Sequence, residues 1–159
     1  PLARKITNII AIPTIGIGAG PVPLIKAMDK LQSQSTSNPS SIAMAAAVEA
    51  FSGPQDTVEA MRKVFEERRN LVVGMLNKAK GMHCSTPDGA FYVYPSVQGC
   101  IGKTSKGGVL IKDDEAFAWT LLAEEGVATV HGAAFCFPGY IRISYANSNA
   151  ELIAAMSRI

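Results

Sequence analysis

Residues 9–25 read IIAIPTIGIGAGPVPLI, an apolar run broken by glycines and prolines. Its isoleucines are β-branched, which favours a packed, pleated strand. Because the run is almost continuously apolar, such a strand would be buried on both faces, as in the sheet of an α/β domain. Gly18 and Gly20 would then turn the chain, and Pro21 and Pro23 suit the first turn of a helix. The run therefore predicts an α/β fold in which this strand has neighbours on both sides.

The same run could be mistaken for a membrane-targeting segment. Residues 6–25 carry no charged side chain and reach the roughly twenty residues of a membrane span, and Arg4 and Lys5 precede them as in a signal peptide. Its glycines and prolines would interrupt a helix, however, and a bilayer interior requires a continuous helix or a barrel. The glycines also follow a GxGxG pattern without the frame of a phosphate loop. We therefore predict an interior strand and no membrane partner.

Composition narrows the class of protein further. The 159 residues are 48% hydrophobic and 18% charged, which favours an ordered domain that leaves some apolar surface for a neighbour. Fifteen basic and thirteen acidic residues are interspersed and give a net charge of +2, so we predict no nucleic-acid partner. Cys84, Cys100 and Cys136 share no CxxC spacing, which argues against a metal site or a disulfide framework and favours a reducing, cytoplasmic setting.

The rest of the chain alternates helical and extended patterns. Apolar residues at helical spacing, bounded by serine, proline or glycine, predict helices over 23–34, 41–52, 55–79, 113–125 and 149–159. Short β-rich runs predict strands over 90–94, 127–132 and 140–146. The second half is thus strand, helix, strand, strand, helix, which indicates a compact α+β unit.

Several phrases occur together, in order and at a consistent spacing. They are AGPVPLIKAMDKLQSQSTSNPSSIA, AAVEAFSGPQD, ERRNLVVGMLNKAKG, GAFYVYPS, EEGVATVHGAAF and YIRISYANS. The set closely resembles the C-terminal part of class I aminotransferases that depend on pyridoxal phosphate, in the bacterial aspartate aminotransferase-like branch. The resemblance covers about residues 16–159.

The resemblance implies an architecture and an activity. Residues 1–53 would be the remnant of a large cofactor-binding domain, comprising a strand and two helices. Residues 54–80 would be a long interdomain helix, and residues 81–159 a small C-terminal α/β domain that closes on substrate. Such enzymes move an amino group between an amino acid and a 2-oxo acid. The implied partners are therefore these substrates and either a second copy of the chain, as in a homodimer, or the missing large domain.

Arg142 is the main candidate for substrate binding. The arginine of the equivalent RISYA phrase in the family binds the substrate α-carboxylate, and a guanidinium is always charged and matches a carboxylate with a planar pair of donors. From spacing alone, an arginine paired with an acid on a polar sheet face is the simpler interpretation. For cofactor binding, Asn38 resembles a residue of the segment that approaches the partner subunit's site, although Asn before Pro is also ordinary turn chemistry. His131 would face the cleft, where a structural role is the simpler interpretation.

One motif of the family is not matched. Transamination needs a Schiff-base lysine, an acid beside the pyridine nitrogen and phosphate ligands. The family phrase SKAYAMTGWRIG supplies the lysine and an arginine, whereas residues 5–16 here read KITNIIAIPTIG. Ile6 takes the place of the lysine and Thr14 that of the arginine, and Lys5 is one residue out of register. A slip of one residue reverses the face of a strand, so we predict no catalytic residue in the isolated chain.

Two functional hypotheses follow from this sequence. In the first, the chain is the C-terminal portion of an aspartate aminotransferase-like enzyme, inactive alone and active only with a large domain that carries pyridoxal phosphate. In the second, it is a non-enzymatic domain that associates with itself or with a partner through its apolar N-terminal run.

Overall fold

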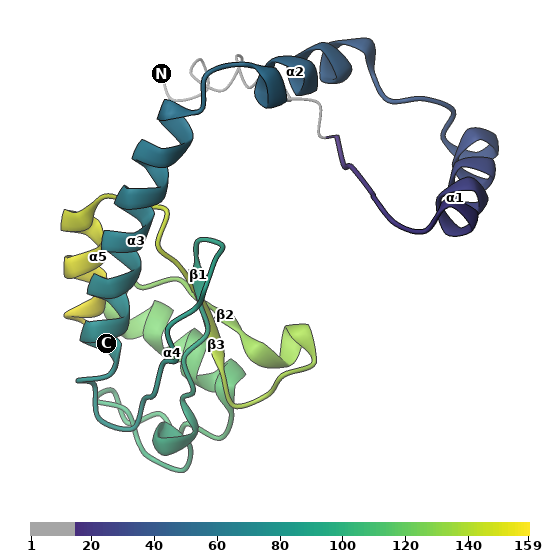
Figure 1. The fold of residues 1–159 in the computed structure, drawn as a ribbon. Helices are drawn as coiled ribbons and strands as arrows, with labels where there is room; N and C mark the ends of the chain where they lie inside the picture. The colour runs from purple at the N-terminus through teal and green to yellow at the C-terminus, as the bar shows by residue number, and fades with distance from the viewer. Residues whose placement is uncertain (1–14) are drawn as a thin grey trace, which may run out of the picture. The chain divides into compact units, whose positions relative to one another are not determined.

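The computed structural model describes residues 15–159, and Figure 1 shows how their elements follow one another. The chain divides into two compact units, one ending at Asp56 and one running from Thr57 to Ile159. The elements are α1 (Val22–Ser35), α2 (Ser41–Ser52), α3 (Asp56–Leu76), β1 (Tyr92–Val93), η2 (Gln98–Cys100), α4 (Asp114–Glu125), β2 (Val130–His131), η3 (Gly132–Phe135), β3 (Ile141–Ser144) and α5 (Asn149–Met156). These bounds confirm the five predicted helices, whose ends differ from the predictions by at most three residues.

The two helices of the first unit begin and end where the sequence predicts. Pro21 precedes α1 and accepts the first helical hydrogen bond, from Ile25 N–H at 3.1 Å, and Pro23 occupies the first turn, where its missing N–H costs nothing. The N–H of Thr36 closes the helix on the carbonyl of Gln32 at 2.9 Å. Burial in this unit is slight. No residue of α1 is buried, and α2 buries only Ala43.

The strand predicted within residues 9–25 is not seen in its described part. Residues 15–20 form no strand, and the side chain of Ile17 is 67% exposed. A strand needs neighbours to satisfy its backbone N–H and C=O groups, and the three-stranded sheet of the described residues lies entirely within the second unit. Residues 9–14 of the predicted strand lie outside the described part of the chain.

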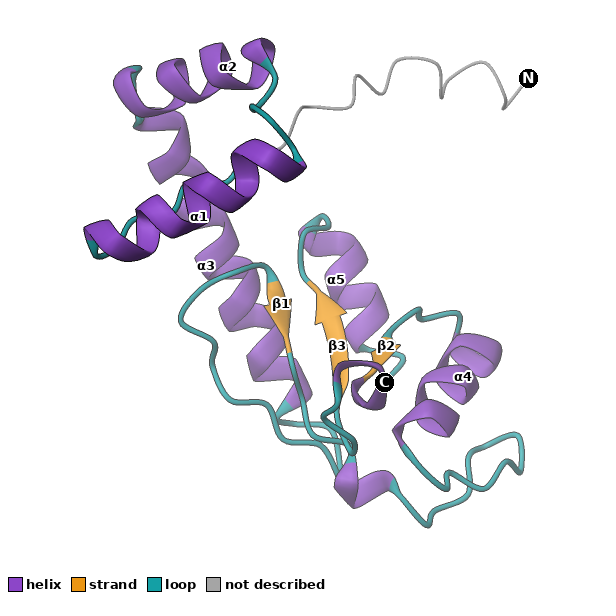
Figure 2. Ribbon diagram, turned by 90° about the vertical axis from the view of Figure 1, so that its right-hand side faces the viewer, coloured by secondary structure: helices purple, strands orange, loops and turns teal. Residues whose placement is uncertain are grey.

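The sheet of the second unit has three antiparallel strands in the order β1–β3–β2, with β3 in the centre (Figure 2). Tyr92 pairs with Ser144 across β1 and β3, and Val130 pairs with Arg142 across β2 and β3. The predicted strands are confirmed in position but are shorter than predicted. The chain leaves β1 at Pro95, which has no N–H to donate to a ladder, and β2 runs directly into the 3-10 turn η3 at Gly132.

One face of this sheet packs into the core of the second unit. Ile141 and Ile143 alternate with outward residues along β3, and both are buried. They join one cluster with residues of α3, α5 and the intervening loops: Val72, Val73, Leu76, Cys84, Val93, Val97, Tyr145, Leu152 and Met156. The side chain of Asn77, just after α3, fixes the next loop by accepting from Cys84 N–H at 2.8 Å and donating to Cys84 C=O at 2.9 Å. These contacts set the position of the sheet against α3 and α5.

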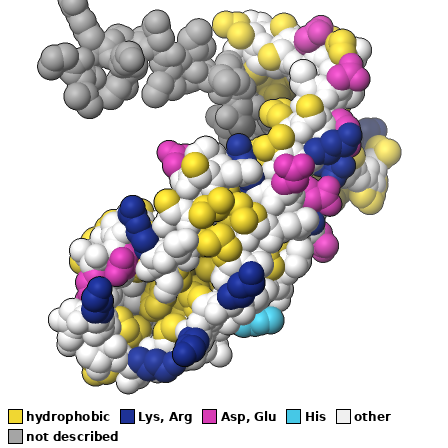
Figure 3. Space-filling model, turned by 90° about the vertical axis from the view of Figure 1, so that its left-hand side faces the viewer, with side chains coloured by type: hydrophobic (Ala, Val, Ile, Leu, Met, Phe, Trp, Pro, Cys, Tyr) yellow, Lys and Arg dark blue, Asp and Glu magenta, His cyan; other side chains and the backbone are white. Residues whose placement is uncertain are grey.

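Hydrophobic side chains also lie open on the molecular surface, as on the face drawn in Figure 3. In the first unit the large exposed ones are Ile17, Val22, Leu24, Met28, Leu31, Ile42, Met44, Val48 and Phe51. None of the described helices is both long and apolar enough to cross a membrane.

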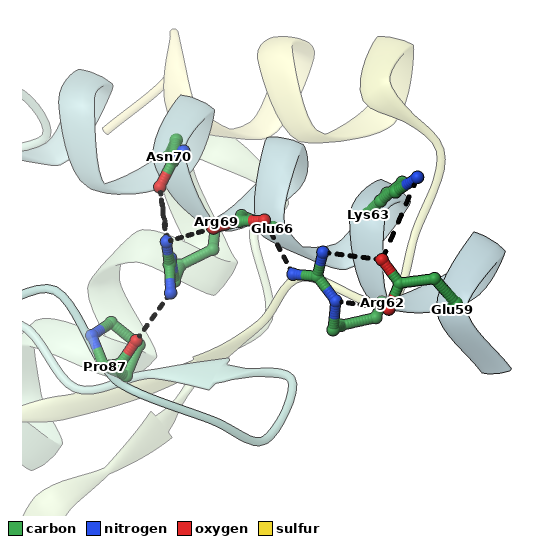
Figure 4. Close-up of polar contacts among 7 residues, drawn as sticks. All are labelled: Glu59, Arg62, Lys63, Glu66, Arg69, Asn70 and Pro87. Atoms are coloured by element: carbon green, nitrogen blue, oxygen red, sulfur yellow. Dashed lines mark hydrogen bonds and ion pairs between the residues drawn. The ribbon is translucent and has the colours of Figure 1, made fainter.

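The N-terminal half of α3 carries opposed charges at helical spacing (Figure 4). Arg62 donates to Glu59 at 2.7 Å and to Glu66 at 2.8 Å, and all three side chains are about half exposed. One turn further, Arg69 donates to the backbone carbonyl of Pro87 at 3.2 Å. This bond joins α3 to the loop that leads into β1.

Candidate functional site

The register of the sheet places Arg142 on the face opposite the core. Along β3 the buried residues are Ile141 and Ile143, so Arg142 and Ser144 point the other way. Tyr92 pairs with Ser144 and therefore lies on the same face, diagonal to Arg142. The side chain of Arg142 is half-buried on this face.

Two aromatic rings hold the Arg142 guanidinium. Its central carbon lies 4.7 Å from the centre of the Tyr92 ring and 4.4 Å from that of Phe135. Cations at these distances are attracted to the negative face of a ring, and flat contacts of this kind restrict the plane of the guanidinium. Within residues 15–159, no carboxylate forms an ion pair with Arg142 and no hydrogen bond occupies its N–H groups. The group is thus charged, oriented and available to bind a carboxylate.

Phe135 comes from the segment Gly132–Gly139, which has little freedom at its start. Gly132 N–H donates to the carbonyl of Tyr140 at 2.7 Å, and Phe137 N–H donates to the carbonyl of Gly132 at 3.0 Å. A Cβ on Gly132 would collide with the Phe137 carbonyl oxygen and would lie 2.8 Å from the Tyr140 carbonyl oxygen. Only glycine fits at this close approach of backbones.

Asp114, in the first turn of α4, also holds this segment. Its Oδ2 accepts from Ala133 N–H at 2.8 Å, and its Oδ1 accepts from Gly139 N–H at 3.1 Å. Burial acts to raise the pKa of Asp114, but these two N–H donors, with a smaller contribution from His131, outweigh it and hold that pKa below its usual value. Asp114 is therefore a carboxylate at neutral pH, although only 2% of it is exposed.

More aromatic rings surround this arrangement. Tyr94 stacks on Tyr140 with ring centres 5.9 Å apart, and the Phe137 ring lies 4.3 Å from Tyr140. Burial raises the pKa of Tyr94, the Asp114 carboxylate raises it further, and the Arg142 guanidinium opposes both. Since Phe135 and Phe137 are about half exposed, this aromatic surface is open to a ligand that reaches Arg142.

The other residues singled out by the sequence are not gathered around Arg142. His131 pairs with Ile141, so it lies on the opposite side of the sheet from Arg142. Asn38 is exposed in the loop between α1 and α2, in the first unit, and its side chain forms no hydrogen bond with any described residue. Lys5, Ile6 and Thr14 lie outside the described residues. The described residues also contain no group of three or more His, Cys, Asp or Glu that could hold a metal ion.

Residues 15–159 do not bring together the groups that a pyridoxal phosphate site needs. Asn38 is exposed in the loop between α1 and α2, in the first unit, whereas Arg142 belongs to the second. Arg142 lies in an aromatic clamp and has the chemistry of a substrate-carboxylate ligand, without a lysine or a pyridine-nitrogen acid shown beside it. The arrangement has the chemistry to recognise a carboxylate.

Known proteins resemble this chain in sequence and in fold. The family profile described as "Aminotransferase class I and II" matches residues 11–159. The chain is 60% identical over 145 residues to the aspartate/prephenate aminotransferase of Cereibacter sphaeroides, a match that covers 91% of this chain and 36% of that protein. It is 56% identical over 145 residues to the probable aspartate/prephenate aminotransferase of Rhizobium leguminosarum bv. phaseoli, with the same coverage.

A solved structure shows the same partial match. The structure superimposes on the crystal structure of the aspartate aminotransferase from Rhizobium meliloti with a TM-score of 0.80 and 47% sequence identity. The superposition covers 88% of this chain and 35% of that one. The chain therefore spans about a third of the length of the relatives that it matches.

Proposed function

The chain belongs to the class I and II aminotransferase family, and from this premise we propose that it is the C-terminal portion of an aspartate aminotransferase-like transaminase. The complete enzyme would move an amino group between an amino acid and a 2-oxo acid. This chain would contribute the carboxylate-binding side of the active site, and it would be inactive alone.

The observation that carries this proposal is the aromatic clamp on Arg142. An arginine on a rigid central strand, held between Tyr92 and Phe135 and free of an acidic partner among the described residues, is preorganised for a planar anion. Every amino acid and 2-oxo acid substrate carries an α-carboxylate of this kind. We assign its recognition to Arg142.

The family uses pyridoxal phosphate, and we propose that residues outside this chain hold it. Residues 1–53 would be the remnant of the large cofactor-binding domain, with Asn38 in a loop that approaches the cofactor side of a partner subunit. Residues 54–80 would join the two domains, and residues 81–159 would form the small domain. The exposed apolar faces of α1 and α2 support this assignment, because they need a large apolar neighbour. The same faces would serve a self-associating binding domain, and membership of the family favours the enzyme.

A chimeric enzyme tests the proposal. Residues 15–159 replace the matching portion of the Rhizobium meliloti aspartate aminotransferase, which is 48% identical over 145 residues. We expect aspartate transamination by the chimera, and a rise of roughly 100-fold in the KM for aspartate on Arg142→Ala, since the guanidinium makes two charge-assisted hydrogen bonds to a carboxylate. Arg142→Lys should recover part of this loss.

Arg158→Ala provides the matched control, because the Arg158 side chain is exposed and its one hydrogen bond among residues 15–159 goes to the backbone carbonyl of Glu125, not to the Arg142 site. Its KM should stay at the chimera's own value. An Arg142→Ala chimera with an unchanged KM for aspartate would contradict the assigned role of Arg142.

A further inference from the structure

We propose that Asp114 is a positioning residue for Arg142: its buried carboxylate holds the segment Gly132–Gly139 so that the Phe135 ring rests against the guanidinium. The inference deepens the proposed function and rests on it, because its consequence is the strength of carboxylate binding at Arg142. Asp114 itself would not touch the ligand.

The burial of Asp114 requires an explanation. It is the one charged side chain that is buried among residues 15–159, at 2% exposure. Burial of a carboxylate is costly unless hydrogen bonds compensate it. Its partners here are backbone N–H groups, those of Ala133 and Gly139, and no arginine or lysine pairs with it. This buried charge is therefore used to fix a backbone conformation.

The two hydrogen bonds hold the segment near both of its ends. Ala133 and Gly139 are six residues apart, and the residues between them are exposed. Besides the bonds to Asp114, the segment is restrained by the bond of Phe137 N–H to Gly132 and by the contact of the Phe137 ring with Tyr140, neither of which involves Phe135. The segment also bends through Cys136, whose φ of 56° lies in the left-handed region that non-glycine residues adopt infrequently. Without the Asp114 bonds, we expect this segment to leave the observed conformation.

Phe135 transmits the effect to Arg142. Its ring is 46% exposed and its backbone belongs to the segment that Asp114 holds, so the segment sets where the ring lies. If the ring moves away, the guanidinium keeps only the contact with Tyr92 and gains rotational freedom. Binding a carboxylate then includes the entropic cost of fixing the guanidinium.

Carboxylate binding to the 159-residue chain tests this inference, with succinate as the probe. The Arg142 Nε–H resonance reports the position of the rings through their ring-current shift, and its titration gives the Kd. For Asp114→Asn, in which an NH₂ group would face a backbone N–H, we expect the shift to move toward that of an exposed arginine and the Kd to rise roughly fivefold or more. Asp113→Asn is the matched control, since it removes the same charge one residue away and asparagine caps a helix as well as aspartate does.

Phe135→Ala is the second variant, because it removes the half-exposed ring and leaves the buried bonds of Asp114 intact. We expect it to weaken succinate binding as much as Asp114→Asn does. The double variant should be no weaker than Phe135→Ala alone, since both changes act through one ring. A role of Asp114 in stability alone would leave the two effects additive.

The outcomes separate this inference from the proposed function. If Asp114→Asn leaves both the Nε–H shift and the Kd equal to those of Asp113→Asn, or if the two effects add, the inference is overturned. If Arg142→Ala binds succinate as well as the unaltered chain does, the proposed role of Arg142 fails, and the Nε–H shift still decides whether Asp114 positions the side chain.

Discussion

The two units of this chain both contain helices with apolar residues, but only one unit packs them into a core. In both units, residues at the helix ends favour starting or ending a helix. In the first unit, however, α1 buries no residue and α2 buries only Ala43. In the second unit, α3, α5 and the three-stranded sheet enclose a continuous core that includes Leu76, Ile141 and Tyr145. Periodicity is enough to specify a helix, whereas burial needs partners from elsewhere in the sequence. Exposed apolar residues, rather than helix content, therefore distinguish the unit with a packed core from the unit without one.

Substituting one apolar residue in each unit by alanine should give the largest difference in the free energy of unfolding. Leu76 is 1% exposed and Phe51 is 74% exposed. We expect Leu76→Ala to lower the free energy of unfolding of the second unit by about 2–5 kcal/mol, because it leaves a cavity. Phe51→Ala should change it by less than about 0.5 kcal/mol. Urea denaturation followed by Trp119 fluorescence measures both, and a large effect of Phe51→Ala would contradict the division into a unit with a packed core and a unit without one.

Acid should act on the second unit through Asp114. Its pKa is lowered in the folded state, so its contribution to stability is fully present above the ordinary value near 3.8 and is lost as the pH falls through the folded pKa. We expect Asp114→Asn to lower the free energy of unfolding at pH 7 by about 1–3 kcal/mol and to flatten its dependence on pH below 4.

Urea melts of the Asp114→Asn variant and the unaltered chain between pH 2 and pH 7 test this expectation. Asp113→Asn serves as the control, because it should keep the pH dependence of the unaltered chain. Identical acid profiles for Asp114→Asn and the unaltered chain would show that the two N–H bonds do not stabilise the carboxylate.

Removing a helix-capping serine from each unit should give the smallest difference in stability. Ser148 and Glu151 form a reciprocal capping box at the start of α5, with Ser148 Oγ accepting from Glu151 N–H at 3.3 Å, whereas Ser40 makes no side-chain hydrogen bond at the start of α2. We expect Ser148→Ala to lower the free energy of unfolding by about 1 kcal/mol. Ser40→Ala should lower it by about a few tenths of a kcal/mol at most. Thermal unfolding by circular dichroism compares the two, and equal effects would remove this difference between the units.

Local signals in the sequence were sufficient for the helices and for the positions of the strands along the chain. A proline precedes α1, serines precede α2 and α5, and a glycine follows α4. Each of these residues marks a helix end locally, so the predicted ends lie close to the observed ones. Strand lengths were overestimated because residue types alone do not show how far a strand pairs with its neighbour. The predicted strand over 127–132 pairs only at Val130 and His131, although β3 continues to Ser144.

The candidate site could likewise be predicted only in part from the sequence. Arg142 could be found because the phrase around it is local and specific. The residues around Arg142 could not be predicted. Tyr92, Phe135 and Asp114 come from three separate segments that meet only in the folded protein. Asp113 and Asp114 both look like ordinary acids at the start of a helix. Only the fold shows that Asp113 caps α4 while Asp114 is buried against another loop.

The open faces of α1 and α2 have a consequence for the survival of this polypeptide in a cell. Chaperones and proteases act on apolar segments that are not packed away, and degradation proceeds from whichever region is accessible to them. The lifetime of the polypeptide would thus depend on residues 15–56, however stable the second unit is. Among the trypsin sites of residues 15–159, limited digestion should cut first at Lys26 or Lys30 in α1, well before any site within the packed core.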